Sequence, residues 1–297
     1  MLYHGVTRIK SRGIENFSQK HLPVEAFFDQ MKYISKNCQV LSMDQVVEIL
    51  NNSLAFPSKS VVVTFDDSFE NIYTNAAPIL EDLNIPTVFY ITTGYIDSED
   101  MFWVDKIEDC INRTKVRKIE LPYCKETFLL DTNKNKVNSL IKIKDFCKII
   151  STKIKSEIVE ALIERSKINP EVKSSKNYRK LTWSQLKELG ENPQFIIGGH
   201  SHTHSILSQI SLQELDFEIG HCIDLLRQNL NREIKHFSYP EGQEDHYNEE
   251  VIKRLKDRGI ICAPTAIPGL NPKGSDPFHL KRIMVNFMGI PFPYHLQ

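Results

Sequence analysis

The sequence predicts an α/β protein in which parallel strands are wrapped by helices, either as an open sheet or as a closed barrel. Two observations support this class: short runs of β-branched apolar residues predict buried strands, and they alternate along the chain with amphipathic helix patterns. With 297 residues, 41% of them hydrophobic, the chain is long enough to bury one large core or two smaller ones.

Each expected element follows from its hydrophobic pattern. Apolar residues spaced three to four apart predict helices, and continuous runs rich in Val, Ile, Phe and Tyr predict buried strands. Pro78 interrupts one helix pattern, and Ser211 is placed to cap another. In chain order we expect helices at 24–37 and 43–54, a strand at 60–65, a helix at 71–84, strands at 87–96 and 195–200, a helix at 211–230, a strand at 236–240, a helix at 248–259 and a strand at 260–265.

The segment from about 99 to 180 breaks this alternation. We expect it to be an inserted, mostly helical subdomain within a single domain that spans residues 1–297. Residues 111–180 hold 18 Lys or Arg against 8 Asp or Glu, so the insertion is basic. Two interpretations stay open: a solvated helix face, or a cover that attracts an anionic substrate such as a nucleotide-linked or lipid-phosphate-linked sugar.

Composition narrows the protein class. A formal net charge of −1 gives no support for nucleic-acid binding, which needs a clearly basic domain. Six cysteines without C-x-x-C spacing predict reduced thiols, and no apolar core of a signal peptide follows the first residues. No apolar run approaches the roughly 20 residues of a membrane span. We therefore expect a cytoplasmic protein without a transmembrane segment; the oligomeric state is not indicated.

Two carboxylates end the apolar run at 60–65, where Asp66 and Asp67 stand side by side. In parallel α/β proteins functional residues gather at the carboxyl ends of strands. Taken alone, such a pair is also typical of a helix N-cap.

A histidine cluster follows another predicted strand, in GGHSHTHS at 198–205. His200 and His204 are four residues apart, so they share a face if the turn is helical, whereas His202 falls on another side. Two imidazoles and one carboxylate leave positions open for water and substrate, as catalytic zinc sites do. Two histidines alone are more often structural, but together with the carboxylates they favour metal-dependent hydrolysis.

Three motifs in this order resemble those of the polysaccharide deacetylase family, carbohydrate esterase family 4. They are TFDD at 64–67, HSHTH at 200–204 and FSYPEG at 237–242. The motifs are most similar to those of the exopolysaccharide and poly-N-acetylglucosamine deacetylase branch. The resemblance implies a distorted (β/α) barrel, often of seven strands, and metal-dependent removal of an N-acyl group from an amino sugar of a polysaccharide, an oligosaccharide or a precursor.

The resemblance also implies roles for single residues. Asp67, His200 and His204 would hold a divalent metal, most commonly Zn²⁺, with Co, Mn, Fe or Ni as alternatives. Asp66 would be the general base that takes a proton from water. The backbone N–H of Tyr239 would stabilise the oxyanion that forms at the acyl carbonyl.

Two departures from the family pattern leave roles to be filled. FSYPEG has no Arg to orient the base, and Arg282 in HLKRIMV resembles the Arg of an L-x-R-I element in exopolysaccharide-type relatives, which makes it the expected partner of Asp66. The late L-x-H histidine that would act as general acid is not evident. We prefer His4 in LYHGV for this role over His279 and His295.

The sequence also allows other functions. A deformylase or a cyclic amide hydrolase could use the same barrel, and a non-catalytic relative could bind carbohydrate. A metal-dependent phosphoesterase is favoured only by the basic insertion.

Overall fold

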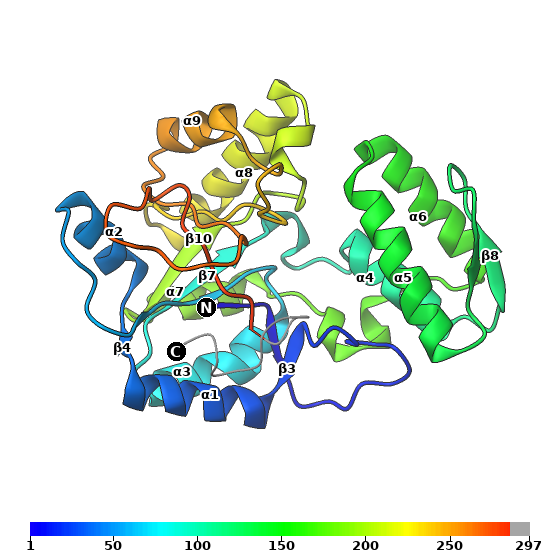
Figure 1. Cartoon of the computed structure of the whole chain (residues 1–297), viewed down its shortest axis with the longest axis horizontal. Helices are drawn as coiled ribbons and strands as arrows, with labels where there is room; N and C mark the ends of the chain where they lie inside the picture. The colour runs from blue at the N-terminus through cyan, green and yellow to red at the C-terminus, as the bar shows by residue number, and fades with distance from the viewer. Residues whose placement is uncertain (286–297) are drawn as a thin grey trace. The chain divides into compact units, whose positions relative to one another are not determined.

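The computed structural model describes residues 1–285 (Figure 1). These residues form two units: unit 1 contains residues 1–8, 18–98 and 180 onward, and unit 2 contains Ile9–Phe17 and Glu99–Arg179. Within the described part of the chain, no helix combines the length and the apolar character needed to cross a membrane.

Unit 1 is built on a sheet of four parallel strands in the order β1-β6-β7-β10. The strands are β1 (Leu2–Tyr3), β6 (Val63–Phe65), β7 (Thr87–Ile91) and β10 (Phe195–Gly199). Phe65 is in register with Tyr3 on one side and with Phe89 on the other. The predicted α/β class with parallel strands is confirmed.

The remaining elements of unit 1 are short strand pairs and helices around this sheet. The short strands are β2 (Gly5–Thr7), β3 (His21–Pro23), β4 (Gln39–Val40) and β5 (Ser60–Val61). The helices are α1 (Val24–Asn37), α2 (Met43–Asn51), α3 (Ala77–Asp82), α7 (Trp183–Glu191), α8 (Leu212–Leu230) and α9 (Glu249–Asp257), with a π-helical turn at Ile72–Ala76 and 3₁₀ turns at Thr93–Tyr95 and Leu207–Gln209.

Helix boundaries follow the predictions where capping is clear. Ser211 caps α8 through a reciprocal capping box with Glu214, as predicted for Ser211. The helix expected at 71–84 instead starts as a π-helical turn and becomes α-helical only at Ala77. Pro78 explains this, because it has no N–H for the regular hydrogen bond to the preceding turn.

Two predicted strands are not regular strands. Within residues 1–285, the segments at 236–240 and 260–265 pair through isolated bridges, Gly199 with Phe237 and His236 with Cys262. Each segment contains a proline, Pro240 or Pro264, which has no backbone N–H to donate to a neighbouring strand. Regular strand pairing therefore cannot continue through these positions. A further bridge joins Leu2 to Met284.

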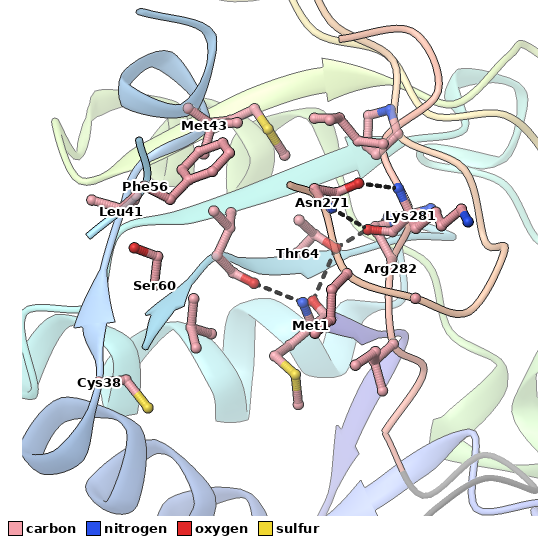
Figure 2. Close-up of a pocket in the computed structure, with 18 of the residues that line it drawn as sticks. Met1, Cys38, Leu41, Met43, Phe56, Ser60, Thr64, Asn271, Lys281 and Arg282 are labelled. Atoms are coloured by element: carbon pink, nitrogen blue, oxygen red, sulfur yellow. Dashed lines mark hydrogen bonds between the residues drawn. The ribbon is translucent and has the colours of Figure 1, made fainter. Parts of the chain in front are cut away.

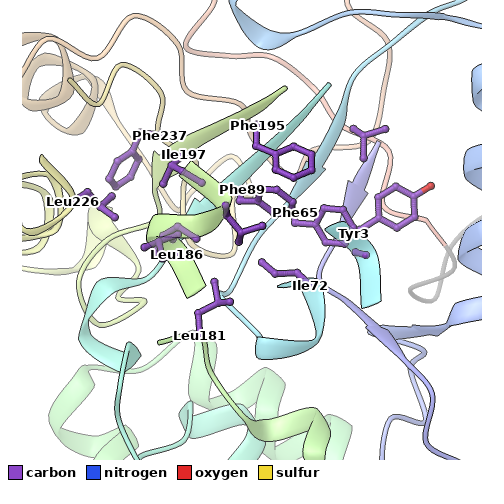
Figure 3. Close-up of a cluster of buried hydrophobic side chains, with 14 of the residues drawn as sticks. Tyr3, Phe65, Ile72, Phe89, Leu181, Leu186, Phe195, Ile197, Leu226 and Phe237 are labelled. Atoms are coloured by element: carbon purple, nitrogen blue, oxygen red, sulfur yellow. The ribbon is translucent and has the colours of Figure 1, made fainter. Parts of the chain in front are cut away.

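The core of unit 1 is aromatic at its centre (Figure 3). Tyr3 stacks on Phe65 with ring centroids 5.4 Å apart, and Phe89 meets Phe195 edge to face at 5.2 Å. All of β6 and β7 is buried, as expected for parallel strands covered on both faces. This packing fixes the residues that follow β6 at one end of the sheet.

Unit 2 contains three α-helices, α4 (Trp103–Arg113), α5 (Asn133–Lys148) and α6 (Thr152–Ser166). It also contains an antiparallel hairpin, β8 (Lys118–Glu120) and β9 (Thr127–Leu129), and 3₁₀ turns at Val172–Ser174 and Lys176–Tyr178. Its separate core includes Ile14, whose N–H donates to the side chain of Asn112. No sequence pattern indicates that residues 9–17 pack with this unit.

Candidate active site

Asp66 and Asp67 follow β6 directly and begin what we name the carboxylate turn, residues 66–68. The N–H of Asp66 donates to the Tyr3 carbonyl at 3.0 Å, which extends the pairing of β6 with β1 by one residue. Asp67 and Ser68 then adopt left-handed backbone conformations, with φ of 78° and 63°. Such conformations are unfavourable for residues with a Cβ and occur preferentially at functional sites. The two neighbouring carboxylates therefore point in different directions.

Arg282 holds the first carboxylate. Its guanidinium donates to both oxygens of Asp66, at 2.9 and 2.8 Å, and also to the Thr64 hydroxyl and the Thr265 carbonyl. Only 4% of each residue is exposed. A bidentate pair of this kind fixes the plane of the carboxylate as well as its charge.

His200 follows β10, and the residues after it form the histidine loop, residues 201–205. The loop is not helical, so the condition under which four-residue spacing would align the two histidines does not hold. Instead, Ser201 and His204 have left-handed backbones with φ of 60° and 61°, and the His204 N–H donates to the Ser201 hydroxyl at 2.9 Å. The loop turns back so that both imidazoles face Asp67.

The ligand atoms of Asp67, His200 and His204 all lie within 4.8 Å of one another. The Asp67 carboxylate is 3.2 Å from Nε2 of His204 and 3.6 Å from Nε2 of His200. Asp66 stands beside this group, 3.9 Å from Nε2 of His200. The ring of His202 instead contacts His221, with centroids 4.6 Å apart.

Ser238 orients the His200 ring. The Nδ1 atom lies 2.8 Å from the Ser238 carbonyl and 2.7 Å from the Ser238 hydroxyl. A carbonyl can only accept, so Nδ1 carries the proton and Nε2 keeps its lone pair toward Asp67. Histidine ligands in metal sites are commonly oriented by such a contact.

Burial and charge act against each other on these groups. Burial raises the pKa of Asp66, but the charge and the hydrogen bonds of Arg282 outweigh it, so the pKa lies below its ordinary value. Burial also opposes ionisation of Asp67, yet the hydrogen bond and charge of His204 hold its pKa well below the usual range.

The two imidazoles differ from each other. Burial lowers the pKa of His200 to about 4, so His200 is neutral at pH 7. Burial also lowers the pKa of His204, but the hydrogen bond to Asp67 more than compensates and raises it above the ordinary value.

His4 lies at the end of β1, partly buried. Burial lowers its pKa, against the opposing charges of Asp67 and Asp66. These interactions place the imidazole beside the carboxylate turn, and at pH 7 it is mostly neutral. His279, by contrast, pairs with Asp276 on the surface, and His295 lies outside the described residues.

The Tyr239 side chain is buried and faces the C-terminal segment. Its hydroxyl donates to the Phe278 carbonyl at 3.0 Å, and its ring stacks on Tyr247. Among residues 1–285 the backbone N–H of Tyr239 has no hydrogen-bond partner. A role for Tyr239 at the site thus concerns its backbone.

Three site residues were missed by sequence reasoning. Ser238 contacts His200, the charge of Glu241 raises the pKa of His204, and Glu218 bonds the histidine loop. Ser238 and Glu241 stand inside FSYPEG, so the motif itself could have pointed to them. Glu218 lies in α8 with no motif around it.

A cavity of about 390 Å³ lies at the amino ends of β1 and β6 (Figure 2). It is lined mainly by apolar side chains such as Leu41, Met43 and Phe56, and Arg282 forms part of its wall. Asp67, His200 and His204 do not line it. The cavity is therefore distinct from the carboxylate–histidine cluster.

The donor set fits a divalent metal. Catalytic zinc sites use ligands of this kind, and here they are two imidazoles and one ionised carboxylate. The contact with Ser238 orients the Nε2 lone pair of one of the imidazoles, that of His200. A second carboxylate, paired with arginine, stands next to them. Fold and site together define an α/β protein with a candidate metal-dependent hydrolase centre.

The chain belongs to the polysaccharide deacetylase family. The family model matches residues 54–262, well over half of the chain and including all three motifs. The membership expected from TFDD, HSHTH and FSYPEG is thus confirmed.

Relatives of the expected branch are found among characterised proteins. The chain is 33% identical over 98 residues to the poly-β-1,6-N-acetyl-D-glucosamine N-deacetylase of Staphylococcus aureus (strain MSSA476). This match covers 33% of the chain and 32% of that relative, so it spans only about a third of either protein.

Solved structures share the fold over nearly the whole chain. The Streptococcus pyogenes deacetylase PplD in complex with acetate matches with a TM-score of 0.61 and 18% identity, covering 96% of this chain and 90% of that one. IcaB from Ammonifex degensii matches with a TM-score of 0.61 and 16% identity, covering 96% and 89%. At these identities the likeness establishes the fold.

Proposed function

We propose that this protein hydrolyses the amide bond of an N-acetylated, or more generally N-acylated, amino sugar in a polysaccharide, an oligosaccharide or a precursor. The observation that carries the proposal is the arginine-paired carboxylate Asp66 next to the Asp67, His200 and His204 cluster, in a member of the polysaccharide deacetylase family. The names of the S. aureus relative and of PplD, both deacetylases, support the same reaction.

Asp67, His200 and His204 would hold the divalent ion, and Zn²⁺ suits these ligands best, with Co, Mn, Fe or Ni as alternatives. When bound, such an ion supplies Lewis acidity at the acyl carbonyl and makes water easier to deprotonate. Ser238 keeps the His200 Nε2 available for this role.

Asp66 is assigned the role of general base. Its carboxylate remains ionised because Arg282 stabilises the negative charge, and it takes the proton of the water that attacks the acyl carbon. Arg282 fixes the carboxylate plane, so the oxygens cannot rotate away from the attacking water.

Two further residues complete the scheme. The backbone N–H of Tyr239, which has no partner among residues 1–285, would donate to the developing oxyanion. His4, neutral in the free protein, would accept the proton that Asp66 takes from water and deliver it to the nitrogen of the leaving amine, so that both residues return to their starting forms.

We propose in addition that the sheet of unit 1 closes into a distorted (β/α) barrel of seven strands. Support comes from the bridges that continue pairing beyond β10, at Phe237 and Cys262, and that join Met284 to β1. An experimental structure with continuous pairing from Cys262 to Met284 would establish closure.

We propose further that the substrate is anionic and that the protein acts in the cytoplasm. The excess of basic residues at 111–180 supports a phosphate-linked sugar, and cell fractionation tests the location. A preference for nucleotide-linked or lipid-phosphate-linked sugars over neutral oligosaccharides would support the anionic substrate.

Product analysis tests the reaction. The purified protein, loaded with Zn²⁺ or Co²⁺, is incubated with N-acetyl, N-formyl and phosphorylated amino sugars, both free and as β-1,6-linked oligomers. We expect acetate release in excess of formate or phosphate release. Formate alone would identify a deformylase and phosphate alone a phosphoesterase, while binding without turnover would identify a non-catalytic carbohydrate-binding relative.

A further inference from the structure

We infer that Glu218 is a positioning residue that holds the histidine loop, and through it the metal ligand His204, in the geometry of the site. The inference rests on the proposed function, because it assigns Glu218 a part in metal binding. Glu218 belongs to α8, which follows the loop in sequence.

The contacts of Glu218 all reach one short segment. One carboxylate oxygen accepts the backbone N–H groups of His202 and Thr203, at 2.9 and 2.8 Å. The other accepts the hydroxyls of Thr203 and Ser205. A single side chain thus binds the two residues before His204 and the one after it.

Glu218 is buried, so its carboxylate needs these hydrogen bonds to replace those it would make with water. Glu218 is only 5% exposed and forms no ion pair among the described residues. A buried carboxylate is costly unless hydrogen bonds satisfy it. Since its donors come from the histidine loop alone, the charge of Glu218 and the loop conformation depend on each other.

The loop in turn requires external support. It contains no regular hydrogen-bonded structure, and Ser201 and His204 both have left-handed φ angles, which side chains with a Cβ rarely adopt. Helix α8 is a rigid support, because its capping box and its buried residues, such as Ile219 and Cys222, anchor it to the core.

The other acidic side chains of α8 have different partners. Asp216 pairs with Arg254, Asp224 pairs with Arg258, and Glu214 closes the helix cap at Ser211. Glu218 is thus distinguished by burial and by its contacts rather than by charge alone.

The test measures metal affinity by competition with a chromophoric chelator for Zn²⁺. We expect Glu218→Ala to weaken binding about 10- to 100-fold, the usual range for a residue that orients a ligand. Glu218→Gln should bind Zn²⁺ within a few-fold of the wild-type affinity. Its amide oxygen can still accept both backbone N–H groups, and its NH₂ group can donate to the Thr203 hydroxyl, which would then accept instead of donating.

Ser211→Ala is the matched control, since it weakens the cap of the same helix without touching the loop. It should lower the thermal unfolding temperature and leave metal affinity unchanged. Wild-type affinity in Glu218→Ala, or an equal loss of affinity in Ser211→Ala, would overturn the inference.

A second variant covers the case in which Glu218→Ala does not fold. Thr203 is exposed, so Thr203→Val removes one hydrogen bond to Glu218 without emptying the core. We expect metal binding several-fold weaker, and unchanged affinity would refute the role of Glu218. His204→Ala, which removes a proposed ligand, distinguishes failure of this inference from failure of the proposed function. If the wild type binds no more metal than His204→Ala, the proposed function is wrong, and the inference about Glu218 fails with it.

Discussion

The carboxylate turn and the histidine loop meet at one site but are held in place by different means. In the carboxylate turn, Asp66 is still part of the sheet, because its N–H bonds the Tyr3 carbonyl of the neighbouring strand. The histidine loop has left the sheet: the His204 N–H donates to the Ser201 hydroxyl, and Glu218 accepts hydrogen bonds from the loop residues on either side of His204. Backbone pairing positions one half of the site, and side chains from elsewhere position the other half.

This difference means that the two halves should respond differently to mutation. Substitutions around the carboxylate turn should affect proton transfer and folding, because Asp66 and Arg282 form a buried ion pair. Substitutions around the histidine loop should affect metal affinity with smaller changes in folding.

Removing a ligand from either half should abolish both metal binding and turnover. We expect each wild-type chain to bind about one divalent ion. Asp67→Ala and His200→Ala should lose this ion, because a site with three protein ligands does not hold the metal when one ligand is removed. Metal analysis of dialysed protein measures this. His202→Ala is the control, since its ring faces His221, and it should keep the ion. Retention of the ion by His200→Ala would disprove the ligand assignment.

Arg282→Ala should strongly affect the carboxylate half. It leaves Asp66 buried without its partner, at a cost in folding free energy of about 3–5 kcal/mol. The pKa of Asp66 should also rise, so the acidic limb of the pH–rate profile should move to higher pH. Arg282→Lys keeps the charge and should show a smaller shift of the same sign.

The sign of the stability effect follows from the depressed pKa of Asp66. In the wild type, the pair stabilises the fold above the ordinary aspartate pKa, and this stabilisation is lost as pH falls through the lower folded value. Arg282→Ala should therefore reduce stability most near neutral pH and least in acid. Equal destabilisation at all pH values, measured by chemical denaturation, would argue against the ion pair as the cause.

Ser238→Ala should have the smallest effect. The carbonyl of residue 238 still accepts from His200 Nδ1, and only the hydroxyl contact is lost. A net hydrogen bond of about 0.5–1.5 kcal/mol corresponds to a two- to tenfold weaker metal affinity. Ser208→Ala, whose hydroxyl bonds the Asp245 carbonyl, serves as the control and should bind metal like the wild type.

The same contrast explains what could be predicted from sequence. The position of Asp66 and Asp67 at the end of β6 was predictable, because an apolar run with β-branched residues defines a buried strand locally. Helix α8 and its cap at Ser211 were predictable for the same reason, since capping is a short-range interaction.

The histidine loop was predicted less completely. The four-residue spacing of His200 and His204 pointed to a shared ion, but through a helical turn that the loop does not form. The site also has contacts between residues far apart in sequence: Glu218 accepts from Thr203, 15 residues away, and Ser238 contacts His200, 38 residues away. Contacts at such separations leave no periodic pattern in the sequence. The packing of residues 9–17 with unit 2 was missed for the same reason.

The most direct test of the division between the two halves is Asp66→Asn, assayed for metal content and acyl release on the same preparation. Asp66 is assigned to proton transfer and Asp67 to the metal, although they are adjacent in sequence. We expect full metal content with turnover reduced by about 10²- to 10⁴-fold, the usual contribution of a general base. Near-normal turnover, or loss of the metal together with activity, would contradict it.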